Sequence, residues 1–195
     1  TVWNVQLPEI RVGARAVEEL GCQLRSLGVV EGDRGLVVTD RTLVGLGHAD
    51  RVTDAIEDGG FDVDIYDDCA REPSVADVTA CLSFVREEGD GGYDFYVGLG
   101  GGSVAEPTGA GEDLTESGPP LVLLPTTAGT GSEISPVAIL SVEEKEIKEG
   151  ISSNSVRADA AVLDPTLTTS LPPDVTARTA MDALGHAMEG YTTHA

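Results

Sequence analysis

The sequence predicts an α/β fold: a parallel sheet flanked by helices, followed by a purely helical segment. Three observations lead to this fold class. Short apolar runs alternate with helical stripes along most of the 195-residue chain. A glycine-rich turn directly follows one of these runs. After Asp164-Pro165 the strand-like runs stop, and Pro172-Pro173-Asp174 is typical of a helix start.

Apolar residues at helical spacing predict three helices that each bury one side. These helices lie at 17–27, 49–57 and 75–85. The first ends at Gly28 and the second at Gly59-Gly60, because glycine favours helix termination. The segment after Pro172-Pro173-Asp174 is predicted to be helical to its last residue.

Short apolar runs predict the strands, which lie at 35–39, 61–66, 95–97, 121–124, 137–140 and 160–163. The 61–66 run alternates apolar residues with polar ones, mostly acidic, as expected of a strand with one face in water. Because strands and helices alternate, we expect a parallel sheet covered by helices. Such sheets bind ligands at the carboxyl ends of their strands.

Two segments that follow predicted strands carry residues suited to a nucleotide. Residues 98–103 read GLGGGS, and glycine lets backbone N–H groups approach a phosphate without a Cβ in the way. Residues 125–133 read PTTAGTGSE, and the hydroxyls of Thr126, Thr127 and Thr130 can donate to a phosphate or a ribose. Taken alone, the first segment is also compatible with a flexible loop and the second with a polar turn.

Asp182 and His186 lie four residues apart in the predicted last helix. This spacing places a carboxylate and an imidazole on one face, one turn apart. A metal site needs at least a third ligand, so the pair is half of such a site or else an ordinary polar pair. The three cysteines, Cys22, Cys69 and Cys81, lie far apart and are expected to be core residues rather than a disulfide or metal framework.

The charge is strongly negative, with 34 acidic and 12 basic residues and a net charge of −22 at pH 7. Only two basic residues are lysines, Lys145 and Lys148. A dispersed acidic surface almost free of lysine predicts a halophilic protein, the alternative being an ordinary acidic one. The charge excludes nucleic acid as a partner. No run is long enough to span a membrane and no leader begins the chain, so a cytoplasmic location is expected.

The segments PTTAGTGSE (125–133) and DALGHAMEGY (182–191) closely resemble the iron-containing (group III) alcohol dehydrogenases. Thr39-Asp40, GGGS and Asp164-Pro165 occur in the order that this family shows. The resemblance covers essentially the whole chain, but only the first half of a family member. It implies a Rossmann-like dinucleotide-binding domain at 1–168, followed at 169–195 by the first helices of an otherwise absent all-α metal-binding domain.

The resemblance also assigns site residues one by one. The positions that match cofactor-binding residues of the family are Asp40, Gly101, Gly102, Ser103, Thr126, Thr127, Thr130 and Lys148. Asp40 matches the acid that binds the adenosine ribose, which favours NAD over NADP. Asp182 and His186 match two of the four metal ligands. The other two, both histidines, belong to the part of the family that is absent here, and neither His48 nor His194 matches them.

The function implied is an NAD-dependent alcohol dehydrogenase, in which Fe²⁺ or Zn²⁺ polarises the oxygen of a small alcohol or aldehyde during hydride transfer. No residue of this chain alone is assigned a catalytic role. An exposed face on the last helix would imply a homodimer or a missing C-terminal domain.

Two alternatives stay open. One is a hydroxyacid-oxoacid transhydrogenase of the same superfamily. The other is a catalytically inactive, stand-alone nucleotide-binding domain, which the shortened segment 104–124 and the missing metal ligands support. Segment 104–124 is about half the usual length, Gly109 replaces a lysine of the glycine motif, and Glu72 replaces an asparagine.

Overall fold

The computed structural model describes residues 7–70, 72–89, 92–101, 118–142 and 145–193. Six strands among them form one sheet in the order β1-β8-β5-β4-β2-β3, in which every neighbouring pair is parallel. The strands are β1 (Glu9–Val12), β2 (Arg34–Val38), β3 (Asp62–Tyr66), β4 (Phe95–Gly100), β5 (Leu121–Pro125) and β8 (Ala160–Leu163). The predicted parallel α/β sheet is therefore confirmed.

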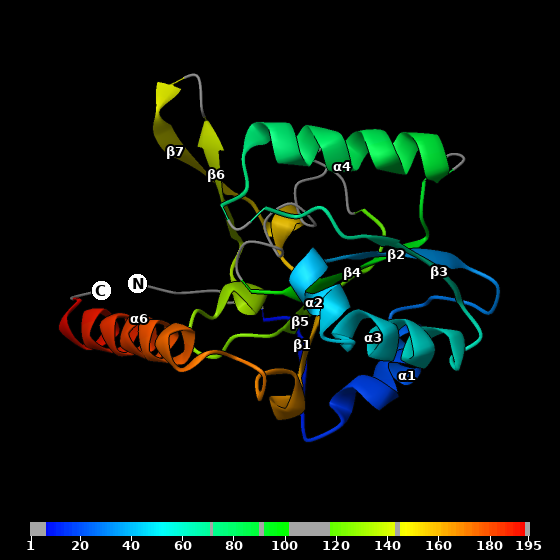
Figure 1. The fold of residues 1–195 in the computed structure, drawn as a ribbon, viewed down its shortest axis with the longest axis horizontal. Helices are drawn as coiled ribbons and strands as arrows, with labels where there is room; N and C mark the ends of the chain where they lie inside the picture. The colour runs from blue at the N-terminus through cyan, green and yellow to red at the C-terminus, as the bar shows by residue number, and fades with distance from the viewer. Residues whose placement is uncertain (1–6, 71, 90–91, 102–117, 143–144, 194–195) are drawn as a thin grey trace, which may run out of the picture.

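Helices lie on both faces of the sheet (Figure 1). α4 covers one face, and α1, α2 and α3 lie on the other. The helices are α1 (Leu20–Ser26), α2 (Arg41–Gly45), α3 (His48–Glu57), α4 (Val75–Glu88) and α6 (Pro173–Thr192), with short 3-10 turns η1 (Ala16–Glu19), η2 (Ser132–Ile134), η4 (Asn154–Val156) and η5 (Pro165–Leu167). The predicted helix at 17–27 is thus split between η1 and α1.

Strand β2 lies between β4 and the edge strand β3 and is buried by apolar residues on both faces. Val37 belongs to the cluster that contains the buried residues of α1 and α3. Its neighbours Leu36 and Val38 belong to a second cluster with Cys81 of α4. Alternate side chains of a strand point to opposite faces, so both faces of β2 are buried. This explains why the sequence of β2 is a continuous apolar run.

The strand predicted at 137–140 exists, but it is not part of the parallel sheet. β6 (Val137–Val142) pairs antiparallel with β7 (Ile147–Ser152) in a separate two-stranded hairpin. Only one face of β6 is covered: Leu140 packs on Val78 of α4, whereas Val137 and Ile139 are exposed. The apolar run correctly indicated a strand, but it carried no information about the partner strand, and the expected place in the parallel sheet is wrong.

The three cysteines form no disulfide, but they are not all core residues. Cys81 is buried and Cys69 is half-buried beside it, and burial raises the pKa of the Cys69 thiol to about 12 and of the Cys81 thiol to about 11. Cys22 is exposed, because α1 turns Leu20 and Leu24 inward and presents Cys22 to solvent. The expectation of a core position is therefore wrong for Cys22.

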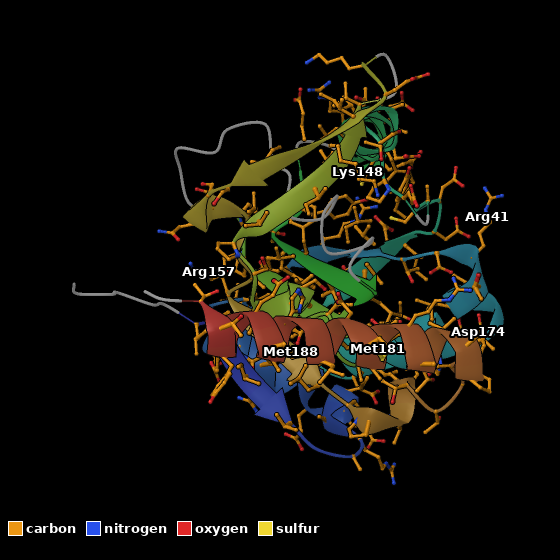
Figure 2. The ribbon with its side chains drawn as sticks, turned by 90° about the vertical axis from the view of Figure 1, so that its left-hand side faces the viewer. Arg41, Lys148, Arg157, Asp174, Met181 and Met188 are labelled. Atoms are coloured by element: carbon orange, nitrogen blue, oxygen red, sulfur yellow. The ribbon has the colours of Figure 1, made fainter. Side chains whose placement is uncertain are left out.

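The predicted C-terminal helix is confirmed as α6, which spans Pro173–Thr192 and has no buried residue. Met181, Leu184 and Met188 are exposed along one side of it, and Figure 2 shows the two methionines on the face of α6 turned to the viewer. None of the helices that the structure describes is both long and apolar enough to cross a membrane. A domain boundary at 168/169 remains a prediction.

Candidate functional site

The order of the strands indicates where a fold of this type binds a ligand. β2 lies between β3 and β4. The connection from β2 to β3 carries α2 and α3, whereas the connection from β3 to β4 carries α4 on the opposite face (Figure 1). The chain therefore reverses its direction of winding between β2 and β4. Open α/β sheets bind their ligands at such a switch point, outside the carboxyl ends of the strands.

Asp40 lies at the carboxyl end of β2, where it caps helix α2. Its Oδ1 accepts hydrogen bonds from the N–H groups of Thr42 at 2.7 Å and Leu43 at 3.1 Å. The preceding residue, Thr39, donates its hydroxyl to the carbonyl oxygen of Leu99 at 2.9 Å, which joins the ends of β2 and β4. Among the described residues, none donates to Asp40 Oδ2.

Gly101 and Thr127 follow the neighbouring strands β4 and β5 and lie side by side. A Cβ built on Gly101 would lie 3.4 Å from both Cγ2 and Oγ1 of Thr127. The two loops are joined by the N–H of Thr126, which donates to the Gly100 carbonyl at 2.9 Å. Thr127 Oγ1 is buried and has no hydrogen-bond partner within the described ranges. A buried hydroxyl without a partner costs free energy and calls for an explanation such as a bound ligand.

The other members of the two cofactor motifs are less informative. Thr130 lies within its own loop, its Oγ1 3.2 Å from Ser132 Oγ. Gly102 and Ser103 lie outside the described residues, so their predicted role at the pyrophosphate stays a prediction. The structure thus brings Gly101, Thr126 and Thr127 together and places Asp40 on the strand next to β4.

Lys148 lies on strand β7 of the β6–β7 hairpin, outside the parallel sheet (Figure 2). Its Nζ is 3.6 Å from a carboxylate oxygen of Glu72, and both side chains are largely exposed. Within the described ranges, that ion pair is the polar side-chain contact that Lys148 makes. Its predicted contact with the cofactor is therefore a proposal that the hairpin position neither supports nor opposes.

Asp182 and His186 lie on α6, one turn apart, and both are exposed. No group of three or more histidine, cysteine or carboxylate side chains that could hold a metal occurs among the residues that the structure describes. The two residues alone therefore do not form a metal site. His48 makes a contact of 2.9 Å from its Nε2 to Ser170 Oγ, and burial together with the charge of Arg51 lowers its pKa. His194 lies outside the described residues, and the expectation that neither histidine is a metal ligand stays a prediction.

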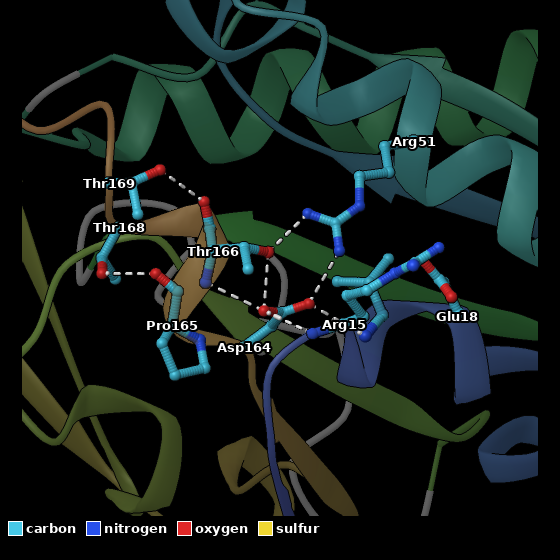
Figure 3. A network of polar contacts seen from close by, with 9 residues as sticks. Arg15, Glu18, Arg51, Asp164, Pro165, Thr166, Thr168 and Thr169 are labelled. Atoms are coloured by element: carbon cyan, nitrogen blue, oxygen red, sulfur yellow. Dashed lines mark hydrogen bonds and ion pairs between the residues drawn. The ribbon is translucent and has the colours of Figure 1, made fainter.

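A buried carboxylate that the sequence did not single out lies at the end of β8. The side chain of Asp164 is fully buried and forms an ion pair with Arg51 of α3, Nη2 to Oδ2, at 2.9 Å. Thr166 connects the same two residues: its hydroxyl donates to Asp164 Oδ1 at 2.7 Å and accepts from Arg51 Nη1 at 2.6 Å (Figure 3). The N–H groups of Arg15 and Val17 also donate to the carboxylate.

These hydrogen bonds decide the charge state of Asp164. Burial alone raises the pKa of a carboxyl group, but the bonds from Thr166, Val17 and Arg15 outweigh burial, and the net pKa of Asp164 lies below its ordinary value. Asp164 is therefore an anion that joins three segments: the turn after β1, helix α3 and the start of the connection to α6. In the sequence, Asp164-Pro165 marked only the end of the strand-like runs, and no local signal indicated Arg51.

A pocket of about 290 Å³ lies at the carboxyl ends of β1, β5 and β8. Its lining includes Val12, Thr127, Gly129 and Asp164. Thr127 thus lines this pocket while it also packs against Gly101. The pocket is continuous with the strand ends at which parallel sheets bind ligands.

Comparison with known proteins gives a consistent result. A family model described as iron-containing alcohol dehydrogenase matches residues 8–165. Long-chain-alcohol dehydrogenase 1 of Geobacillus thermodenitrificans is 36% identical over 95% of this chain and 50% of its own length. The mitochondrial hydroxyacid-oxoacid transhydrogenase of Xenopus tropicalis is 31% identical over 97% of this chain and 44% of its own length.

Solved structures agree. The sulfoacetaldehyde reductase of Bifidobacterium kashiwanohense, crystallised in complex with NAD⁺, superposes with a TM-score of 0.84 at 32% identity, over 98% of this chain and 54% of that one. The chain thus spans about half the length of the relatives it matches. Because the family model covers most of the chain, and the fold and the order of its strand-end motifs agree, the chain belongs to the iron-containing alcohol dehydrogenase family.

Proposed function

We propose that this chain is the nucleotide-binding part of an NAD-dependent, metal-dependent alcohol dehydrogenase. The observation that carries the proposal is the buried, unpartnered hydroxyl of Thr127 beside Gly101, at the carboxyl ends of β4 and β5. A ribose or phosphate oxygen of a dinucleotide supplies the partner that this hydroxyl lacks. The family and the NAD⁺ complex of the sulfoacetaldehyde reductase give independent support.

Asp40 supports NAD rather than NADP. In folds of this type an acidic residue after a strand accepts hydrogen bonds from the adenosine ribose and repels a 2′-phosphate. Asp40 uses one carboxylate oxygen to cap α2, so the cap holds the side chain in place while the second oxygen faces no described donor. The bound nicotinamide would accept the hydride, and Gly101 and Thr127 would hold its phosphates and ribose.

Asp182 and His186 would contribute two ligands to a metal such as Fe²⁺ or Zn²⁺, which would polarise the alcohol oxygen. One carboxylate and one imidazole bind such ions weakly, because metal sites of this kind use three or more protein ligands. The remaining ligands would come from residues outside the described part of the chain. The substrate would be a small alcohol or aldehyde.

A second candidate is a hydroxyacid-oxoacid transhydrogenase. The 31% identity to the Xenopus tropicalis enzyme over 97% of this chain favours it as a relative of nearly equal similarity. In such an enzyme the nicotinamide would stay bound and carry hydride between two acids. Turnover that needs an oxoacid acceptor and releases no free NADH would identify this activity.

Calorimetric titration with NAD⁺ tests the proposal, with Thr127→Val as the informative variant. Valine keeps the shape and removes only the hydroxyl, so the free energy of unfolding should stay equal or rise, while NAD⁺ affinity should fall about fivefold or more. Thr53→Val, on α3, is the matched control, because its hydroxyl is exposed and donates to the Asp50 carbonyl of the same helix.

The activity assay separates the remaining alternatives. Reduction of NAD⁺ that depends on an added alcohol would support a dehydrogenase. Binding of NAD⁺ without reduction, with or without Fe²⁺ or Zn²⁺, would support an inactive nucleotide-binding domain. If NAD⁺ does not bind, or if Thr127→Val binds it as tightly as the unchanged chain, the proposed site is wrong.

A further inference from the structure

The loop that carries the threonines touches the helix that carries Asp182 and His186, and it does so through one glycine. Gly129, in PTTAGTGSE, lies against the backbone of Thr179 in α6. A Cβ built on Gly129 would overlap the Thr179 carbonyl oxygen and would lie 3.0 Å from its carbonyl carbon and 3.2 Å from Cβ of Ala183. The contact with the carbonyl oxygen is too short for a real Cβ and the other two would be tight, so α6 can lie this close only while residue 129 has no side chain.

The backbone of Gly129 restricts this position further. Its φ of +126° lies in a region that residues with a side chain rarely adopt. The close approach and the backbone angle therefore both require glycine here. Gly131 in the same loop also has a positive φ, +67°, but a Cβ there would have no atom within 4 Å, so only the close approach distinguishes Gly129 from it.

The contact fixes which side of α6 faces the threonine loop. Thr179 and Ala183 are the half-buried residues at this contact. Asp182 follows Thr179 by three residues and His186 follows Ala183 by three, so all four share one side of the helix. Met181, Leu184 and Met188 lie on the opposite side, where they are exposed.

We propose that Gly129 is a positioning residue for hydride transfer. Through the Thr179 contact it fixes the separation between Thr127 and the side of α6 that presents Asp182 and His186, so that the cofactor loop and the metal-ligand helix move as one unit. This inference rests on the proposed function, because it assigns the two segments to the cofactor and the metal. Hydride transfer depends steeply on the separation of the reacting atoms, so a displacement of about 1 Å lowers the rate about a hundredfold.

The first test is hydrogen exchange of the α6 amides in Gly129→Ala. We expect exchange at least about tenfold faster, because the added methyl displaces the helix from the loop. Gly92→Ala controls for backbone strain: its φ is +119°, but a Cβ there would meet no atom within 4 Å. Gly131→Ala controls for a change in the same loop. Both controls should leave α6 exchange unchanged after correction for global stability.

The second test enlarges the same contact from the helix side and leaves Gly129 unchanged. Ala183→Leu should displace α6 as Gly129→Ala does, whereas Ala177→Leu, at an exposed position of the same helix, should not. In alcohol oxidation by the native protein, we expect kcat to fall at least about tenfold in both contact variants while KM for NAD⁺ changes less than about twofold. If the contact were merely structural, both variants would lower the melting temperature without lowering kcat at a nearly unchanged KM.

The outcomes separate the inference from the function on which it rests. If the contact variants exchange and turn over like their controls while the unchanged protein oxidises alcohols, Gly129 does not position α6 and the dehydrogenase stands. If the unchanged protein binds no NAD⁺, the proposed function fails, and the exchange of α6 still decides whether Gly129 holds the helix in place.

Discussion

Arg51 and Asp164 are 113 residues apart in the sequence, and they form a 2.9 Å ion pair in which the carboxylate is fully buried. Thr166 bridges the two, and the N–H groups of Arg15 and Val17 complete the set of donors around the carboxylate. The pair joins α3 to the turn after β1 and to the segment that leads toward α6. It therefore holds the carboxyl edge of the sheet together on the side where the 290 Å³ pocket opens.

Asp164→Asn should destabilise the chain by about 3 kcal/mol, since it removes the charge opposite Arg51 and replaces an acceptor oxygen with a donor group. Urea unfolding followed by circular dichroism measures the change. Asp54→Asn is the control, because Asp54 is an exposed carboxylate on the same helix as Arg51, and its loss should change the free energy of unfolding by no more than about 0.5 kcal/mol. Equal losses in the two variants would contradict a special role for Asp164.

Acid should remove the same contribution. The folded-state pKa of Asp164 is depressed, so its stabilisation is fully present above the ordinary value of 3.8 and is lost as the pH falls through the lower folded-state pKa. Asp164→Asn lacks this contribution at every pH. The difference in unfolding free energy between the two proteins should therefore be constant down to about pH 4 and shrink below it. A difference that persists unchanged at strongly acidic pH would show that the carboxylate charge is not its source.

Apolar runs in the sequence predicted most strands of the sheet, because a strand buried on both faces consists mainly of apolar residues. They did not predict strands that form only by pairing with a strand far away in the sequence. β1 (Glu9–Val12) was not predicted, since its four residues include two charges and it is a strand only through its parallel pairing with β8. For the same reason the run at 137–140 was assigned to the wrong sheet.

In the candidate site, too, local features could be predicted from the sequence and contacts between distant segments could not. The positions of Asp40, Gly101 and Thr127 at strand ends were predictable, because each follows a strand within two residues and parallel strands bring their ends together, whereas their role at a cofactor stays a prediction. The partnership of Arg51 with Asp164 and the contact of Gly129 with Thr179 depend on how α3 and α6 pack against the sheet. Neither of these contacts leaves a periodic pattern in the sequence.

Asp40→Asn should lower the ratio of the dissociation constant for NADPH to that for NADH about tenfold. Asparagine is as good a helix cap as aspartate, so α2 and the stability should be retained while the charge that repels a 2′-phosphate is lost. Fluorescence titration with both reduced cofactors gives the ratio. Asp67→Asn makes the same change in charge just after β3 and should leave the ratio unchanged. An unchanged ratio in Asp40→Asn would remove Asp40 from the ribose site.

Potassium chloride should stabilise the chain from low to molar concentration. The net charge of −22 creates repulsion that is screened over about 10 Å at 0.1 M salt but over about 3 Å at 1 M. Thermal melting in a KCl series measures the effect, and sucrose of equal osmolality is the control, because it is excluded from the surface without screening charge. A melting temperature that stays constant or falls with KCl would contradict the halophilic interpretation.

The two lysines of the chain provide a matched pair, because both lie in the β6–β7 hairpin and both pair with a glutamate. Lys148 lies 3.6 Å from Glu72, and Lys145 lies 2.8 Å from Glu149. All four side chains are more than half exposed, so loss of either pair should change stability by less than about 1 kcal/mol. If Lys148 reaches the nicotinamide ribose, Lys148→Met should lower NAD⁺ affinity about tenfold or more, and Lys145→Met should not change it.

Glu72, the ion-pair partner of Lys148, should affect NAD⁺ binding in the opposite direction. If Lys148 contacts the cofactor, the Glu72 carboxylate competes for that lysine, so Glu72→Gln should strengthen NAD⁺ binding, whereas Glu149→Gln should not. Calorimetric titration of all four variants against NAD⁺ measures the effect. Equal losses in Lys145→Met and Lys148→Met would mean that the hairpin attracts the cofactor through its charge alone. No loss in either variant would mean that Lys148 is a surface lysine outside the cofactor site.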